Sequence, residues 1–399
     1  MNEYDSYRIL DLTKKINYIP TRKLSEANCY VLNTCHIREK ATDKVYHHVG
    51  RIKKKFRNKK KPIVVIAGCV AQAEGEILLN KENYIDAVVG PQSYHKLSDA
   101  ILKAEKNYKK INSTEFDVIE KFDNLNSIKN SKSKTSSFLT IQEGCDKFCK
   151  FCVVPYTRGA EFSRSFGEII TECENLVAAG AREIILLGQN VNAYNFKGKK
   201  LSDLIKKIIK INEIARVRYT TSHPIDFTED LIEVHGSSKK LMPIIHLPVQ
   251  SGSNKILQKM NRKHSVEYYI DLIKKIKKIN SKIEFSSDFI IGYPGETEED
   301  FKSTLDLMKE IRFTNCYSFI YSSRVGTPAA KLDPIDVKIA KKRLIKFQAE
   351  ADKIKIKFKK SFFNKKIPVL FENRIGSKSE YFGRDEYSNS VIVKSDKNL

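Results

Sequence analysis

Three cysteines in one short run, Cys145, Cys149 and Cys152, constrain this chain more than any other feature of its sequence. They lie in EGCDKFCKFCVVPYTRG, at positions i, i+4 and i+7. Thiolates are soft ligands that suit iron–sulfur clusters and zinc, and a closed site of either kind takes four protein ligands. No fourth cysteine follows at a matching short spacing. The run therefore predicts a four-iron cluster with one open iron, to which a substrate or cofactor can bind.

Two other interpretations of the triplet are weaker. The spacing also fits one face of a buried helix, but Gly144 precedes it, charged residues interrupt it, and the β-forming segment 138–142 comes just before. A structural zinc site usually shows a second CxxC pair or a nearby pair of histidines. The remaining cysteines are instead isolated from one another: Cys29, Cys35, Cys69, Cys173 and Cys316. We expect a loop that leaves a strand.

Composition bounds the class of protein. A length of 399 residues suits two or three domains. The chain has no apolar run of 18 residues and opens on MNEYDSYRILDL, so we expect no membrane span, no signal peptide and a cytoplasmic location. The formal net charge of +24 favours a nucleic-acid partner. The basic stretch 53–61 could contact RNA, or could be a solvated face enriched in Lys by codon bias; the sequence leaves both open.

Residues 1–105 predict a small doubly wound α/β domain. Short apolar runs at 27–33, 62–67 and 85–89 read as buried strands between helical stretches. Cys35 and Cys69 each follow the carboxyl end of such a strand, which is where ligands bind in open α/β sheets. We therefore expect these two thiols to share a site. Cys29 lies inside its strand, so we expect it to have a core role.

After a polar linker (106–137), residues 138–335 again alternate between strand-like and helical patterns. Six strand-like runs separated by amphipathic helices are too few for an eight-stranded barrel and predict a partial, open barrel. These runs are 138–142, 183–188, 215–220, 243–247, 284–291 and 315–321. Polar or glycine-rich groups at the strand ends include Asn190, Gln250 and Ser251, and the fifth run carries Asp288. His246, in an apolar strand, reads as a satisfied core histidine. A connecting helix (336–361) and a small β domain (362–399), with strands at 367–372 and 390–394, complete the chain.

The triplet on the first strand end of a six-unit barrel resembles the radical S-adenosylmethionine (SAM) enzymes. Within them the chain is similar to the methylthiotransferase family, with which it shares motifs in the same order along almost its whole length. The matching motifs are MNEYDS (1–6), NTCHIREKATDK (33–44), AGCVAQ (67–72), GCDKFCKFCVVPYTRGAEFSR (144–164), GQNVNAY (188–194), HLPVQSGS (246–253), IIGYPGET (290–297) and GTPAA (326–330).

The resemblance implies specific roles for these residues. Cys145, Cys149 and Cys152 would hold the SAM-binding 4Fe-4S cluster, whereas Cys35 and Cys69 would be two of three ligands of an auxiliary 4Fe-4S cluster. We expect SAM contacts from Asn190, Gln250, Ser251 and Asp288. The implied reaction adds a methylthio group to C2 of N6-isopentenyladenosine next to the anticodon in tRNA, with SAM as methyl donor and radical source. The implied plan ends in an RNA-binding TRAM domain. The implied partners are tRNA, an external electron donor and a sulfur source, with no membrane, and we expect a monomer.

Two departures from the family pattern concern the ends of the chain. In the family a Gly-Cys-Gln precedes MNEYDS, and its cysteine is the third auxiliary ligand; here Met1 begins the motif. The TRAM-like segment also ends early, at Leu399. We therefore expect this polypeptide to assemble the SAM cluster but no stable auxiliary cluster. The alternatives are the same chemistry on threonylcarbamoyladenosine in tRNA or on a ribosomal-protein aspartate, a truncated and impaired remnant, or a non-catalytic iron–sulfur protein.

Overall fold

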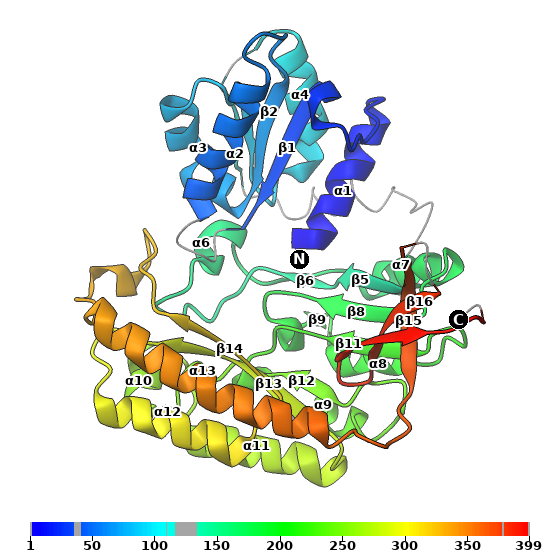
Figure 1. Cartoon of the computed structure of the whole chain (residues 1–399), viewed down its shortest axis with the longest axis vertical. Helices are drawn as coiled ribbons and strands as arrows, with labels where there is room; N and C mark the ends of the chain where they lie inside the picture. Colours follow the sequence, from blue (N-terminus) through cyan, green and yellow to red (C-terminus); the bar gives the residue numbers. More distant parts are fainter. Residues whose placement is uncertain (1, 36–40, 109, 116–133, 377–378, 398–399) are drawn as a thin grey trace.

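A computed structural model describes residues 2–35, 41–108, 110–115, 134–376 and 379–397. The fold is mixed α/β, as predicted: an N-terminal sheet domain lies above an open barrel, and a small C-terminal sheet lies beside the barrel (Figure 1). Residues 36–40 of the NTCHIREK motif and residues 116–133 of the expected linker lie outside the described residues.

The N-terminal domain is built on a parallel sheet of order β1-β2-β3-β4. Helices α2 and α3 pack on one face, and helices α1 and α4 pack on the other. The elements, in chain order, are α1 (Asn2–Lys15), β1 (Cys29–Thr34), α2 (Ala41–Lys55), β2 (Ile63–Gly68), α3 (Cys69–Lys81), β3 (Ala87–Val89), α4 (Leu97–Glu105) and β4 (Ile111–Ser113). The central strand β2 is buried on both faces, which explains its continuous apolar run IVVIA.

The linker is shorter than its predicted bounds of 106–137. Strand β4 lies inside that range and pairs with β3, so the sheet continues past residue 105. At the other end, β5 (Ser136–Thr140) already begins before residue 138. The three residues of β4 include the polar Asn112 and Ser113, so no apolar run marked this edge strand in the sequence.

The six predicted barrel strands are all present and all parallel. They are β5, β8 (Glu183–Leu187), β11 (Arg216–Tyr219), β12 (Ile244–His246), β13 (Glu284–Ile291) and β14 (Asn315–Ile320). A bridge between Val217 and Leu241 joins the first three strands to the last three, so the arc follows chain order. Among the described residues β5 and β14 do not pair with each other, and the partial, open barrel is confirmed.

Helices cover the outer face of the arc and form the main core with it. They are α7 (Phe166–Ala178), α8 (Leu201–Ile208), α9 (Glu229–Val234), α11 (Val266–Ile279), α12 (Glu298–Ile311) and α13 (Val337–Lys360). The last of these is the predicted connecting helix. It packs along β14, and its buried Phe347 ring lies 4.8 Å from the Phe289 ring of β13. Alternate residues of each barrel strand therefore face the helices, and the others face the concave side.

The C-terminal sheet is an antiparallel meander, β15 (Val369–Ile375), β16 (Glu380–Asp385) and β17 (Ser390–Lys394). The middle strand was missed in the sequence because charged residues and Gly383 interrupt any apolar alternation. The barrel holds this sheet by its backbone. Arg216 donates to the carbonyls of Arg384, at 2.6 Å, and of Pro368. Arg218 donates to the carbonyls of Asp385 and Glu386, each at 3.0 Å.

Candidate iron–sulfur and cofactor site

The cysteine triplet lies in a loop at the carboxyl end of β5, as predicted. The loop leaves the short strand β6 (Gln142–Glu143) at Gly144, whose φ is +76° and whose added Cβ would meet the Ala160 carbonyl oxygen at 1.8 Å. Only glycine fits this close, left-handed turn. The amide of Gly144 donates to Gln189 after β8, and the amide of Lys150 donates to the carbonyl of Met260. Neighbouring strand ends therefore fix the course of the loop, and the helical-stripe interpretation is wrong.

The donor set fits an iron–sulfur cluster. Cys149 is buried, and its Sγ accepts a hydrogen bond from Arg262 Nη1 at 3.5 Å. Burial raises the pKa of Cys145 to about 12 and that of Cys152 to about 11, so metal binding must displace their protons. Among the described residues no group of three or more His, Cys, Asp or Glu side chains is arranged to hold one metal ion. A four-iron cluster needs no such convergence, because each thiolate bonds a different iron.

Asn190 connects the triplet loop to the end of β8. Its amide nitrogen donates to Asp226 at 2.7 Å and to Glu161 at 3.0 Å, and Asp226 also pairs with Lys147 of the loop at 2.8 Å. Asn190 is buried, and its Oδ1 atom has no hydrogen-bond partner. Buried polar atoms are nearly always partnered. The orphaned oxygen beside the cluster loop is therefore an open acceptor for a ligand.

The other three predicted SAM contacts lie in two different places. Gln250 follows β12 with a φ of +78°, a strained backbone that is uncommon outside glycine and often found at functional sites. Ser251 is buried, and its hydroxyl lies 3.4 Å from the hydroxyl of Thr304 on α12. Asp288 lies in the middle of β13, where its carboxylate is 3.5 Å from His246 Nε2. The structure thus brings Asn190 to the cluster loop and places Asp288 within the concave face.

Cys35 and Cys69 meet at one sheet edge, as predicted. Thr34 and Gly68 are paired in the register of β1 and β2, and each cysteine is the next residue of its strand. An added Cβ at Gly68, whose φ is +93°, would lie 2.3 Å from the Thr34 carbonyl oxygen, so the chains approach closely here. This edge faces the barrel, because α3 begins at Cys69 and packs on the short helix α6 (Val154–Arg158) that follows the triplet. The third auxiliary ligand is not among the described residues.

Two buried ionic clusters join the N-terminal domain to the barrel. Arg158 of α6 lies 2.7 Å from Asp5 of α1 and 3.4 Å from Glu143. In the second cluster Glu172 of α7 pairs with Arg8 and, at 2.8 Å, with Arg164. Sequence reasoning assigned no partner to any of these residues, since no local spacing links them. Their pairing sets the orientation of the Cys35–Cys69 edge toward the triplet.

Two histidines near the loop predict a sensitivity to acid. Burial and Arg262 lower the pKa of His264 to about 4, and burial together with Arg262 holds the pKa of His223 far below its usual range. An unfolded histidine has a pKa near 6.5. Between that pH and the lowered pKa of the folded state, the unfolded state therefore binds protons that the folded state does not bind. Stability is therefore expected to fall as the pH drops from 6.5 toward 4, by on the order of 1–3 kcal/mol for His264 alone.

Urea unfolding at a series of pH values checks this expectation. The His264→Gln variant should lose less stability than the parent across that range, while Glu350→Gln, a change at a partly exposed position on α13, should follow the parent. Equal slopes for His264→Gln and the parent would contradict the assignment.

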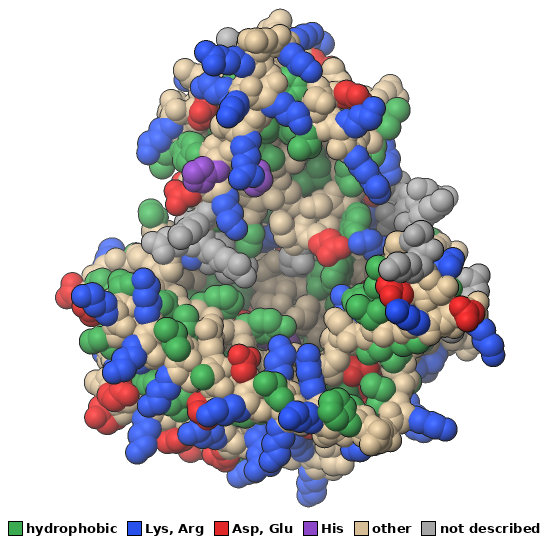
Figure 2. Space-filling view, viewed as in Figure 1, with side chains coloured by type: hydrophobic (Ala, Val, Ile, Leu, Met, Phe, Trp, Pro, Cys, Tyr) green, Lys and Arg blue, Asp and Glu red, His purple; other side chains and the backbone are tan. Residues whose placement is uncertain are grey.

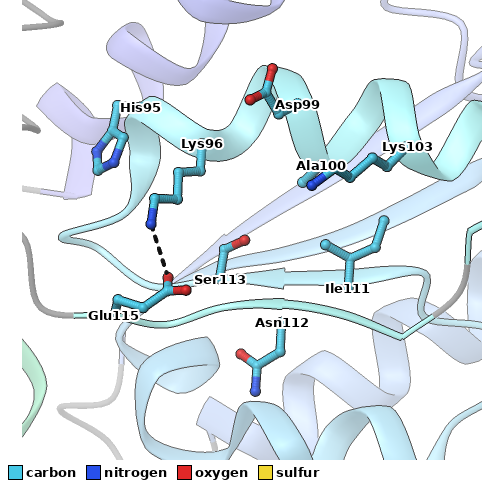
Figure 3. Close-up of a pocket in the computed structure, with 9 residues that line it drawn as sticks. All are labelled: His95, Lys96, Asp99, Ala100, Lys103, Ile111, Asn112, Ser113 and Glu115. Carbon is cyan, nitrogen blue, oxygen red and sulfur yellow. Dashed lines mark ion pairs between the residues drawn. The ribbon is translucent and has the colours of Figure 1, made fainter.

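One further cavity, of about 520 Å³, lies away from this site. It opens between α4 and the edge strand β4, where an ion pair of 3.5 Å joins Lys96 and Glu115 (Figure 3). The basic stretch 53–61 is also remote, because it precedes the amino end of β2 whereas the thiols follow its carboxyl end. Figure 2 shows Lys and Arg side chains spread over the upper domain. The assignment of RNA binding to this stretch stays a prediction.

Comparisons with known proteins agree with this geometry. Residues 139–308 match the radical SAM superfamily, and residues 1–90 match a family described as uncharacterized protein family UPF0004. A tRNA-2-methylthio-N(6)-dimethylallyladenosine synthase of Pelagibacter ubique is 60% identical over 396 residues, which cover 98% of this chain and 89% of that protein. The protein of the same name from Rickettsia akari is 48% identical, over 99% and 91% of the two chains.

The fold has solved relatives as well. A radical S-adenosylmethionine methyltransferase, TsrM, from Kitasatospora setae, with cobalamin and a 4Fe-4S cluster bound, is similar over 77% of this chain and 65% of its own. The TM-score is 0.57 and the identity is 15%. This likeness concerns the arrangement of the sheet domain and the barrel.

Proposed function

Because this chain belongs to the family of tRNA-2-methylthio-N(6)-dimethylallyladenosine synthases, we propose that it adds a methylthio group to C2 of N6-isopentenyladenosine next to the anticodon in tRNA. It is a radical SAM enzyme that uses SAM both as methyl donor and as radical source. One observation carries the proposal: the open-iron triplet lies at the first strand end of a six-stranded arc, and the thiol pair of a second domain faces it. The named relatives favour this substrate over the two related ones and over a non-catalytic role.

The cofactors of this chemistry are SAM and two 4Fe-4S clusters; the described thiols supply the three ligands of the SAM-binding cluster and two of the three ligands of the auxiliary cluster. Cys145, Cys149 and Cys152 would hold the cluster that binds and reduces SAM, which when bound supplies a 5′-deoxyadenosyl radical. Cys35 and Cys69 would be two of the three ligands of the auxiliary cluster, which would supply sulfur. The protein's own part is to hold the two sites toward each other and to keep the thiols out of water.

We place the SAM contacts at the strand ends above the arc. Asn190 Oδ1 is available to accept from the hydroxyl or ammonium groups of SAM, and Gln250 and Ser251 lie at the end of the fourth strand. Asp288 remains a predicted contact that its mid-strand place supports less well. The barrel ends are where chemistry gathers in this architecture.

Replacing Asn190 with Ala is expected to weaken SAM binding about tenfold, as loss of a hydrogen bond to a charged or hydroxyl group does. Equilibrium dialysis of SAM with cluster-loaded protein measures the effect. Asn212→Ala, on an exposed loop, is the matched control and should bind like the parent. Unchanged binding by Asn190→Ala would remove this residue from the site.

Further partners follow from the chemistry. The substrate is tRNA, and an external electron donor and a sulfur source must restore the clusters. We propose that the chain acts as a monomer in the cytoplasm. None of the described helices is both long enough and apolar enough to cross a membrane.

Nucleoside analysis tests the function directly. tRNA from a strain lacking the gene should contain isopentenyladenosine without the methylthio group, and expression of the gene should restore the methylthiolated nucleoside. A strain in which only threonylcarbamoyladenosine loses its methylthio group would reject the proposal.

A further inference from the structure

The concave face of the barrel carries a mixed polar and aromatic surface, of which the chemistry above uses only Asp288. Residues that are paired in a parallel sheet point to the same face, as do alternate residues of one strand. His246 is paired with Ser286, Asp288 with Tyr317, and Ile290 with Phe319. These six residues therefore form one surface across β12, β13 and β14, named here the concave patch. The opposite face of β13 is packed in the main core.

Two aromatic side chains of the patch are open to solvent. Tyr317 is 51% exposed and Phe319 is 43% exposed, although both lie on a strand that helix α13 covers on its other side. Exposed rings side by side on a concave sheet face are typical of a surface that receives a flat apolar or aromatic ligand.

The polar groups between the strands are fixed in place. His246 Nδ1 lies 3.0 Å from the Ser286 hydroxyl, and its Nε2 lies 3.5 Å from the Asp288 carboxylate. Its ring contacts the Tyr317 ring edge to face, at 5.8 Å and 76°. The sequence predicted a satisfied core histidine. Both ring nitrogens of His246 do have partners, but the residue lies on the concave face and is only partly buried, and it positions both the carboxylate and the aromatic ring.

The patch adjoins the cluster loop. Ile290, two residues along the same face from Asp288, packs against the small apolar cluster that also contacts Phe151, between Cys149 and Cys152. Two strand residues span about 7 Å. A ligand that contacts Asp288 would thus lie about 7 Å from Ile290, which packs beside the cysteine loop.

We propose that the concave patch receives the N6-isopentenylated adenine of the substrate, an inference that rests on the proposed function. Tyr317 offers a ring for the base to stack on, as single-stranded RNA bases do on protein aromatics. Asp288 offers an acceptor for the one N6–H of the alkylated base, and Phe319 and Ile290 offer apolar contact to the five-carbon chain.

The same carboxylate would exclude the related nucleoside. Threonylcarbamoyladenosine carries a carboxylate on its N6 substituent, which would meet Asp288 on the patch. Like charges in a partly desolvated site repel, and such a repulsive element sets specificity as effectively as an attractive one. Asp288 would therefore bind the N6–H that both bases carry, and it would favour the isopentenylated base by repelling the carboxylate of the threonylcarbamoyl group.

Binding of labelled anticodon stem-loops to the cluster-loaded full chain tests the proposal. Three stem-loops are compared, bearing adenosine, isopentenyladenosine or threonylcarbamoyladenosine. Tyr317→Ala should weaken binding of the isopentenylated stem-loop about tenfold to a hundredfold, as expected from losing one stacked base. Tyr317→Phe keeps the ring and should bind within about twofold of the parent, given that stacking needs only the ring face. Tyr268→Ala, an exposed tyrosine on α11, is the matched control and should bind like the parent.

Asp288→Asn gives the second arm. It should lower the preference for isopentenyl over threonylcarbamoyl stem-loops by about tenfold, mainly through tighter binding of the latter. If Asp288→Asn instead loses SAM affinity while all stem-loop affinities stay fixed, Asp288 is a SAM contact and the patch assignment is overturned. Unchanged binding by Tyr317→Ala overturns it as well. A parent protein without any preference for the isopentenylated stem-loop would reject the proposed function itself.

Discussion

The Cys149→Ser variant is expected to lose about four iron atoms per chain and all SAM cleavage. A serine hydroxyl stays protonated and does not replace a thiolate on iron, and two remaining thiols cannot hold a four-iron cluster in water. Cys149 is also the one buried cysteine of the triplet, and it receives the hydrogen bond from Arg262.

Iron and sulfide analysis after anaerobic reconstitution, together with the yield of 5′-deoxyadenosine, measures this loss. Cys173→Ala is the matched control, because Cys173 is buried in the core on α7, away from both thiol sites. That variant should keep the iron content of the parent. An unchanged iron content in Cys149→Ser would remove the triplet from the cluster site.

The second large effect is on stability. Glu172→Gln should lower the free energy of unfolding by about 3–5 kcal/mol, because it removes the carboxylate that pairs with both of the buried side chains Arg8 and Arg164. Glu172 is the one acidic group that contacts both guanidinium groups across the domain boundary in the described part of the chain. Urea unfolding followed by circular dichroism gives the value, and a change below about 1 kcal/mol would contradict the role assigned to the cluster.

The control and the pH dependence sharpen this test. Glu350→Gln removes a carboxylate from a surface pair with Lys353 and should leave the free energy of unfolding close to that of the parent. Burial alone would raise the pKa of Glu172, but Arg164 and Arg8 lower it overall. Its contribution is therefore full above the ordinary carboxyl pKa and is lost as the pH falls through the lowered value. The gap between parent and variant should close in acid.

The strands were predictable because each is a short apolar run with a distinct end. All six barrel strands and β1 to β3 lie within a few residues of their predicted bounds. The two missed strands, β4 and β16, are short or interrupted by polar residues and depend on pairing with a neighbour. Pairing is a long-range property that local pattern does not contain.

The site residues that could be predicted from the sequence are those that directly follow a parallel strand. The carboxyl ends of parallel strands gather at one edge, so strand-end residues such as Cys35, Cys69 and Asn190 could be placed from sequence. The roles of Arg262 and Arg158 could not be predicted, because the partners Cys149 and Asp5 are more than a hundred residues away in the sequence and become neighbours only in the folded chain. Asp288 was predicted as a strand-end group, yet its register with Tyr317 puts it within the concave face.

The junction of the C-terminal sheet with the barrel has a consequence for how freely that sheet can change. Arg216 and Arg218 hold it through four main-chain carbonyls, at Pro368, Arg384, Asp385 and Glu386. Every amino acid presents such an oxygen, so these hydrogen bonds fix the path of the polypeptide without specifying the side chains of the residues that accept them. The exposed side chains of this sheet can thus diverge between species while its attachment to the barrel stays the same.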